Sequence, residues 1–317
     1  MVTKSEILKD ALFGVELSDV YVNAPVNGLL FDTGERCRVR ADRFRAIVAQ
    51  DTGHVFSVVA PDYKLVTNLA ALELGRVCFR EIFTITDLSK MKLFNVIMPK
   101  MRSFCHMDFV HEDAKFNPFD KDPWTPYLRI TNSYNRMFAL NFDLGFCRGI
   151  CKNGVIFGKK NIVFKFVHSM KGADPALVFK LRAGEMSALE TEFTEALFNL
   201  KRFHVPRNVM WALACKVFKQ SVPANASKRQ QELWELKQLA IEGMADTYFK
   251  ALGENGYAAL NVLTDFASRP VGMISPEQRI DSLQRQSGSW MGEFIAAMER
   301  RDFIFEVYLG EYAHLVA

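Results

Sequence analysis

The residues with the clearest capacity for chemistry are cations interleaved with aromatic rings in the middle of the chain. Residues 129–172 contain eight Lys and Arg but one carboxylate, Asp143, whereas the whole 317-residue chain has a net charge of +4. Aromatic residues from Tyr127 to Phe164 alternate with these cations. A groove for single-stranded nucleic acid needs cations that follow the phosphates and aromatic faces on which bases stack. The segment therefore predicts a nucleic-acid groove.

A second group of arginines lies near the N-terminus. Arg36, Arg38 and Arg40 occupy alternate positions. Because alternate residues of a strand point to the same face, they predict an arginine stripe on the solvent side of a strand. If this stripe lies beside the basic segment, the two would form one groove.

Together the two segments give one predicted set of contacts. The expected nucleic-acid-binding residues are Arg36, Arg38, Arg40, Arg129, Tyr134, Arg136, Arg148, Lys152, Lys159, Lys160 and Lys165. Tyr134, in a turn, is the aromatic residue that we expect to be exposed. Two other interpretations stay open. The positive charge can belong to a sheet face that acidic neighbours balance in space, and the phenylalanines can fill a core.

Other chemistry finds weaker support. The chain has no glycine-rich phosphate loop, no His-Glu-x-x-His and no Gly-x-Ser-x-Gly. The carboxylates near 108–122 are candidates for binding a divalent cation, but they show no regular ligand spacing. Cys105 and His106 are adjacent, so in a strand they point to opposite faces and do not easily share a metal. We assign no metal, cofactor or catalytic residue and favour a binding role over an enzymatic one.

The elements that must position these residues are mostly strands in the first half. Residues 36–50 and 55–60 flank a turn signal and predict a hairpin. A helix is expected to begin after Thr67 or Asn68 as N-cap and to run to Phe83. Residues 111–126 predict a loop. The basic segment predicts an antiparallel meander, with strands near 127–132, 137–142, 145–151 and 161–167.

The second half has helical periodicity. Helices are expected over 175–203, from Pro206, and over 227–252, 255–268 and 276–302. Strands and helices are thus segregated along the chain, which indicates the α+β class. We expect a β-rich region over 1–170, with a hairpin, a helix and an antiparallel meander, followed by a helical region over 171–317.

The setting expected for the protein is the cytoplasm. No run of 18 apolar residues is present, so no membrane span is predicted. The N-terminal segment lacks the apolar stretch of a signal peptide. The six cysteines are scattered and are expected to be free thiols.

Two stretches of this sequence resemble a family of phage- and plasmid-like proteins known as domain of unknown function 932. The first is FSVVAPDYKLVTNLAALEL, over 56–74. The second contains two signature blocks, Asn132–Arg136 and Arg148–Gly154, and a basic, aromatic strand that ends in His168-Ser169 follows them. The resemblance covers about 36–200. Many members have Asp-Gly where this chain has Asn135-Arg136.

What the resemblance implies is a context. Phages and plasmids commonly encode proteins for single-strand binding, strand annealing and defence evasion, and the expected architecture is broadly like that of single-strand annealing recombinases. We therefore expect a homo-oligomeric single-stranded DNA-binding protein with strand annealing as an extension. Two alternatives stay open: an interaction protein that blocks a host defence factor, and a metal-dependent enzyme that processes nucleic acid. The signature blocks can also recur because tight hairpins need Asn and Gly backbones.

Overall fold

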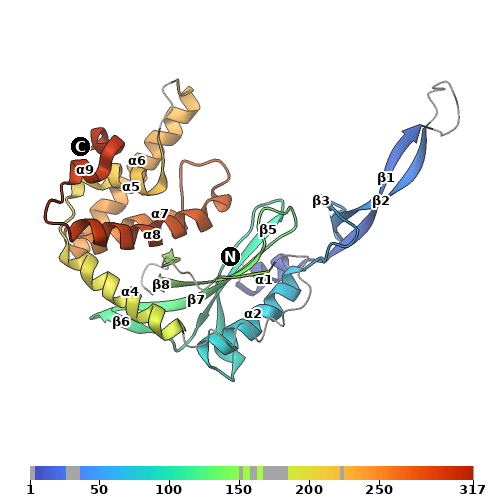
Figure 1. The fold of residues 1–317 in the computed structure, drawn as a ribbon, viewed down its shortest axis with the longest axis horizontal. Coiled ribbons are helices and arrows are strands. Elements are labelled where there is room, and N and C mark those ends of the chain that lie inside the picture. Colours follow the sequence, from blue (N-terminus) through green and yellow to red (C-terminus); the bar gives the residue numbers. More distant parts are fainter. Residues whose placement is uncertain are drawn as a thin grey trace.

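The computed structural model describes residues 4–25, 36–149, 153–157, 163–166, 185–221 and 225–316. Strands of the first half form two antiparallel sheets, and helices of the second half pack on the larger one (Figure 1). This arrangement confirms the predicted α+β class, with a β-rich half followed by a helical half.

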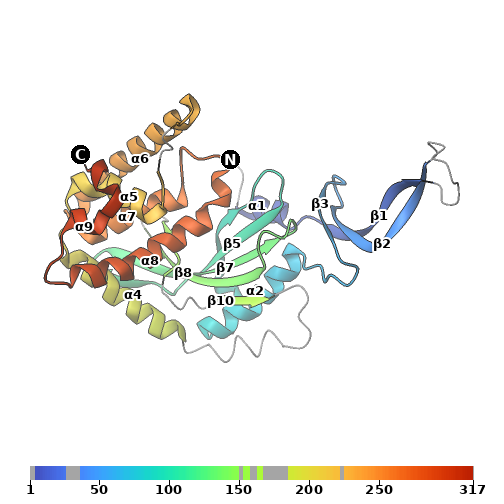
Figure 2. The same cartoon turned by 45° about the horizontal axis from the view of Figure 1, so that its top comes forward.

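The smaller sheet forms the N-terminal end of the molecule. After α1 (Lys4–Ala11), β1 (Val15–Pro25) pairs with β2 (Arg36–Ala49), which pairs with β3 (Val55–Val59). The β2–β3 hairpin confirms the prediction, whereas β1 was not predicted. Because β3 pairs only with the inner part of β2, residues 20–25 and 36–44 form a two-stranded ribbon, which we call the arm. The arm extends away from the body in both views (Figures 1 and 2).

The larger sheet is the predicted meander with additional strands. Its main order is β10-β8-β7-β5-β4, with β6 on β7 and β9 on β8. The strands are β4 (Met91–Ile97), β5 (Phe104–His111), β6 (Phe116–Phe119), β7 (Asp122–Ser133), β8 (Leu140–Arg148), β9 (Gly154–Val155) and β10 (Val163–Phe166). Two predictions were wrong in detail. The strands expected over 137–142 and 145–151 are one strand, β8, and the expected loop over 111–126 contains β6 and the start of β7.

One face of this sheet is apolar and packs on two helices. The helix α2 (Asn68–Phe83) begins after the predicted N-cap Thr67, and its Gly75 lies against Ile130 of β7 so closely that a Cβ would be 2.1 Å from that side chain. On α4 (Glu185–Arg202), Phe193 stacks on Phe146 of β8 with ring centroids 4.1 Å apart. Burial of these side chains is what attaches α2 and α4 to the sheet.

The opposite face is polar, and α8 of the helical half lies on it. Besides α4, that half contains α5 (Met210–Phe218), α6 (Lys228–Leu252), α7 (Gly256–Ser268), α8 (Ile280–Met298) and α9 (Phe305–Leu309). They confirm the predicted helices, except that 175–184 lie outside the described residues. Residues from α2, the sheet and the helical half belong to one hydrophobic core. In the described segments, no helix has both the length and the apolar character needed to cross a membrane.

Tyr134, between β7 and β8, is fully buried, which corrects the expectation that it is exposed. Its ring packs against Phe13 and Phe56, which belong to the smaller-sheet region. Its hydroxyl accepts a hydrogen bond of 2.8 Å from the backbone N–H of Asn68, at the start of α2. Asn132 adds a hydrogen bond to the Asn68 side chain at 2.9 Å. Tyr134 therefore joins the meander, α2 and the smaller sheet.

Replacing Tyr134 by Phe should lower the free energy of unfolding by about 1–3 kcal/mol, because a buried N–H at the start of α2 loses its acceptor. Urea unfolding followed by circular dichroism measures this loss. The matched control is Tyr21→Phe on the exposed arm, which should change stability by less than about 0.5 kcal/mol. Equal effects of the two substitutions would contradict the assigned role of the Tyr134 hydroxyl.

Candidate nucleic-acid interface

The arm presents three arginines on one face. In the register of β1 and β2, Arg40 lies opposite Tyr21, and two residues further along each strand Arg38 lies opposite Asn23. Arg36 shares this side because alternate residues of a strand point the same way. All three arginines are exposed. The structure thus places the predicted stripe on the surface, and we call it the arginine face.

The charges of the arginine face are weakly compensated. Arg40 pairs with Asp42 at 3.1 Å and with Asp19 at 3.4 Å, both near the base of the arm. Exposed pairs of this kind contribute little stability, so Arg40 can exchange a carboxylate for a phosphate. Arg36 and Arg38 have no carboxylate partner within the described ranges. The guanidinium of Arg38 lies 4.2 Å from the centroid of the Tyr21 ring, which holds it on this face.

The exposed set also contains residues that are not among the predicted contacts. Arg43 is exposed at an irregularity in the β1–β2 pairing and has no ion pair among the residues that the structure describes. Tyr21 lies on β1, which was not predicted as a strand. The opposite face of the arm holds the pair Val22 and Val39, both more than 40% exposed. The alternate spacing of the arginines along 36–40 indicated that they share one face. No local sequence pattern indicated β1, the strand that pairs with them.

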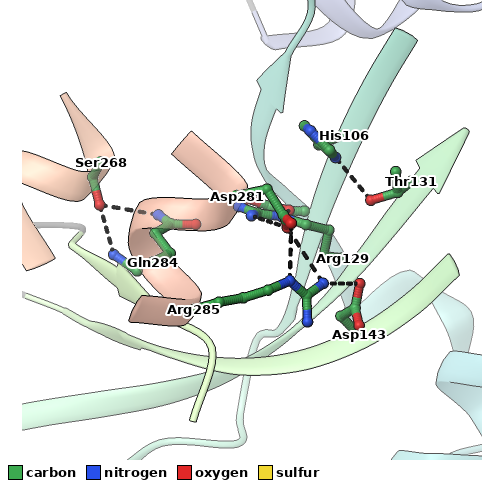
Figure 3. Close-up of polar contacts among 10 residues, drawn as sticks. His106, Arg129, Thr131, Asp143, Ser268, Asp281, Gln284 and Arg285 are labelled. Atoms are coloured by element: carbon green, nitrogen blue, oxygen red, sulfur yellow. Dashed lines mark hydrogen bonds and ion pairs between the residues drawn. The ribbon is translucent and has the colours of Figure 1, made fainter. Parts of the chain in front are cut away.

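Arg129 is not part of a surface, which corrects the prediction that it contacts nucleic acid. Its side chain is fully buried on the polar sheet face. Its Nε and Nη2 donate to Asp108 of β5 at 2.7 and 2.8 Å, and its Nη1 donates to Asp281 of α8 at 3.1 Å. Arg285 of α8 donates both to Asp281 and, at 2.7 Å, to Asp143 of β8 (Figure 3). These five residues form a chain of charges that ties three strands to one helix, which we call the charge chain.

The environment of the charge chain changes its titration. Although burial alone would raise it, Arg129 and Arg285 hold the pKa of Asp281 below its ordinary value. Burial raises the pKa of Asp143 in spite of Arg285. At this position the basic segment is neutralised inside the protein, as the alternative interpretation expected.

Arg148 is also buried and not available, which corrects a second prediction. Its Nε and Nη2 donate to Asp122 at 2.6 and 2.8 Å, and its Nη1 donates to Asn261 of α7 at 3.0 Å. The Tyr257 hydroxyl also donates to Asp122. Asp108 and Asp122, two carboxylates of the region considered for a metal, therefore each bind an arginine. Within the described segments, no group of three or more His, Cys, Asp or Glu residues could hold a metal ion.

The remaining cations of the meander have varied positions. Arg136 is exposed in the turn after β7, with a left-handed backbone at φ 65°. Lys165 lies in β10. Lys152, Lys159 and Lys160 lie outside the described residues. Since the arm extends away from the larger sheet, the condition for one continuous groove with the described strands of the meander is not met (Figure 2).

The second signature block connects the sheet with the helical half. Asn153 is buried, donates to the Tyr248 hydroxyl at 2.9 Å and accepts from Arg269 at 3.0 Å. The N–H of Gly154 donates to Ser268, and a Cβ at this glycine would lie 2.9 Å from the Gln284 side chain. The described residues of this block thus have a structural role through buried polar contacts.

His106 lies on the polar face beside the charge chain. Its Nδ1 is 2.8 Å from the Thr131 hydroxyl, and its Nε2 has no hydrogen-bond partner in the described part of the chain. Burial, followed by the positive charge of Arg129, lowers the pKa of His106 to about 3. The imidazole is therefore neutral at physiological pH.

Replacing Arg129 by Met should lower the free energy of unfolding by about 3–5 kcal/mol, because Asp108 is left buried without a cation. The exposed Arg136→Met is the matched control and should cost less than about 0.5 kcal/mol. Urea unfolding compares the two. If Arg129→Met lowers the free energy of unfolding no more than Arg136→Met does, the structural role of the charge chain is contradicted.

His106 should make the protein sensitive to acid. Its pKa is about 3 in the folded protein, below the ordinary 6.5, so the unfolded chain takes up the proton first and stability falls as pH drops below about 6.5. From pH 7.5 to pH 5 this contribution amounts to about 2 kcal/mol. Urea unfolding at both pH values should show a smaller acid loss for His106→Gln than for the unchanged protein. The exposed His314→Gln should keep the full loss, and an unaltered pH dependence in His106→Gln would refute the assignment.

Comparison with known proteins places these observations in a family. A family model described as "Domain of unknown function (DUF932)" matches residues 55–286, whereas no curated protein and no solved structure matches the chain. The matched range runs from β3 into α8 and contains both signature blocks and the whole charge chain. The arm lies outside it. With well over half of its residues matched, this chain belongs to the family of proteins that carry the domain of unknown function 932.

Proposed function

We propose that this protein binds nucleic acid, and single-stranded DNA in particular, through the arginine face of the arm. The observation that carries the proposal is the exposure of Arg36, Arg38 and Arg40 on one side of a ribbon that extends from the body. Phosphate contacts provide most of the affinity in sequence-independent binding, and they require cations that are free to exchange partners. Arginine meets this need well because its planar fork bonds phosphate oxygens in pairs.

The geometry of the arm supports contact with several phosphates of one strand. Alternate residues of a strand are about 7 Å apart, so each guanidinium can contact a different phosphate. Tyr21 adds an aromatic ring on the same face, and it is 46% exposed. A base can stack on such a ring or on a guanidinium plane, which favours single strands over a paired duplex. A two-stranded ribbon also fits the major groove of duplex DNA, so duplex is the comparison that the experiment must include.

The proposal has one extension, which the family resemblance favours. Several copies of the protein would assemble and anneal complementary strands, in the context of a phage or plasmid. Annealing requires that two strands be held at the same time, so two arms would have to act together. Mixing complementary labelled strands with the protein and following duplex formation tests this extension after binding is established.

The triple variant Arg36→Gln, Arg38→Gln, Arg40→Gln should bind labelled single-stranded oligonucleotides much more weakly. Three lost phosphate contacts should reduce the slope of log K against log salt by about 2. Fluorescence anisotropy at about 50 and 200 mM salt, with single-stranded and duplex oligonucleotides, measures both quantities. The matched control carries the same charge change at exposed arginines elsewhere, Arg202→Gln, Arg300→Gln and Arg301→Gln, and should bind as the unchanged protein does.

Other outcomes would refute the proposal in distinguishable ways. Absence of binding by the unchanged protein at low salt would overturn nucleic-acid binding itself. Binding that survives the arm variant but is lost in Lys159→Glu, Lys160→Glu would place the contacts on the meander. If duplex binds more tightly than single strands, the assignment of the interface stands, but its ligand is duplex DNA and not single-stranded DNA.

A further inference from the structure

A second cationic site lies in the helical half, on elements separate from the arm. A groove with a volume of about 480 Å³ opens between the end of α5, the first half of α6, the loop that follows α7 and the start of α8. Its volume is within the range that holds nucleotide-sized ligands.

The charged residues that line the groove are all positive. Lys219, Lys237 and Arg279 lie in the lining, and no carboxylate of the described residues does. None of the three makes an ion pair with any residue that the structure describes. The positive charges of these three side chains therefore gather around one hollow without a counter-ion among the described residues.

This arrangement has an energetic cost that an anion would remove. Lys237 is half-buried, and burial, together with the nearby charge of Arg279, lowers its pKa. Partial loss of water and repulsion between like charges both disfavour the charged lysine. A bound phosphate would offset both effects, because it supplies a negative charge and hydrogen-bond acceptors.

The remaining lining suits a planar, polar group beside the phosphate. The apolar part of the lining includes Trp234, Leu283 and Met273, and the indole of Trp234 is fixed edge-on against Trp211 with ring centroids 4.8 Å apart. The lining also carries the amides of Gln220 and Gln286, which can bond the edge of a base, whereas the amide oxygen of Gln230 already accepts from Ser227 in the capping box of α6. A nucleobase would use the Gln220 and Gln286 amides, whereas a fatty acid has no groups to bond them.

One wall is held in place by a glycine. Gly272 has a φ of +66°, and a Cβ there would lie 2.4 Å from the carbonyl oxygen of Leu233 and 2.7 Å from Cγ of Lys237. The loop therefore presses directly on α6. This contact keeps Met273 in the wall and positions the stem of Lys237 at the groove.

We infer that this groove binds a nucleotide, with its phosphates against Lys237 and Arg279 and its base against Trp234. The nucleotide is either free in solution or the terminal unit of a strand, and the shared chemistry is a phosphate beside a planar base. The inference does not depend on the arm, because no residue of the groove belongs to it.

The test is isothermal titration calorimetry of the full chain with ATP, tripolyphosphate and adenosine as probes. ATP should bind more tightly than either of the other two, because each of these lacks one half of the recognised chemistry. Lys237→Gln and the exposed Arg279→Gln should each weaken ATP binding about tenfold or more, the effect of one lost charged hydrogen bond. Lys250→Gln, on the exposed end of the same helix, is the matched control and should leave the affinity unchanged.

The outcomes separate this site from the arm. Performing the titrations in the Arg36→Gln, Arg38→Gln, Arg40→Gln background removes binding through the arginine face. If ATP still binds in this background, and if a 5′-phosphorylated oligonucleotide also binds until Arg279→Gln is added, the groove is assigned to a strand end. If ATP binds and the oligonucleotide does not, the groove is assigned to free nucleotides. Equal affinity for ATP and tripolyphosphate, no ATP binding by the unchanged protein, or binding unaffected by both groove substitutions would overturn the inference.

Discussion

The structure depends on pairing of charge between a polar sheet face and one helix. A sheet whose inner strands carry Asp108, Arg129 and Asp143 cannot be covered by an apolar helix, because each buried charge would lose its water without compensation. The helix α8 supplies Asp281 and Arg285 one turn apart, and these two side chains complete the pairing. The apolar face of the same sheet packs on α2 and α4 by ordinary hydrophobic burial. The charge chain therefore fixes α8 on the polar face, and Arg148 and Asn153 add contacts to α7 and α6.

Arginines are buried in the larger sheet and exposed on the arm because their strands have different neighbours. Arg129 lies on β7, which is flanked by β5 and β8 and is covered on both faces. Arg38 lies on a ribbon where β1 is the neighbouring strand and where no helix of the described segments covers it, so its guanidinium is exposed and lies over the Tyr21 ring. The position of a strand in the sheet, more than its sequence, decides which arginines remain available to a ligand.

Local patterns predicted the elements of this fold well, and long-range pairing was the part that they could not predict. The N-cap of α2, the β2–β3 hairpin and the helices from 185 onward follow from periodicity and capping residues that are close in sequence. The burial of Arg129 depends on Asp281, which is 152 positions away, and that of Arg148 depends on Asn261, which is 113 away. Those partners lie outside 129–172, so a count of charge within that segment cannot predict the pairing. The exposed stripe at 36–40 was predicted because alternation alone defines it, whereas β1 and Tyr21 required knowledge of the pairing.

The start of α8 has neighbours on two sides. Asp281 and Arg285 point to the sheet, while Arg279, Ser282 and Gln286, interspersed with them along the same turns, line the groove. A rotation or translation of these turns would break ion pairs in the interior, so the groove wall is as rigid as the sheet that holds it. A ligand entering the groove would meet side chains whose backbone is already ordered, and little conformational entropy would be lost on binding at that wall. The ion pairs buried on one side of α8 therefore hold in place the groove wall on its other side.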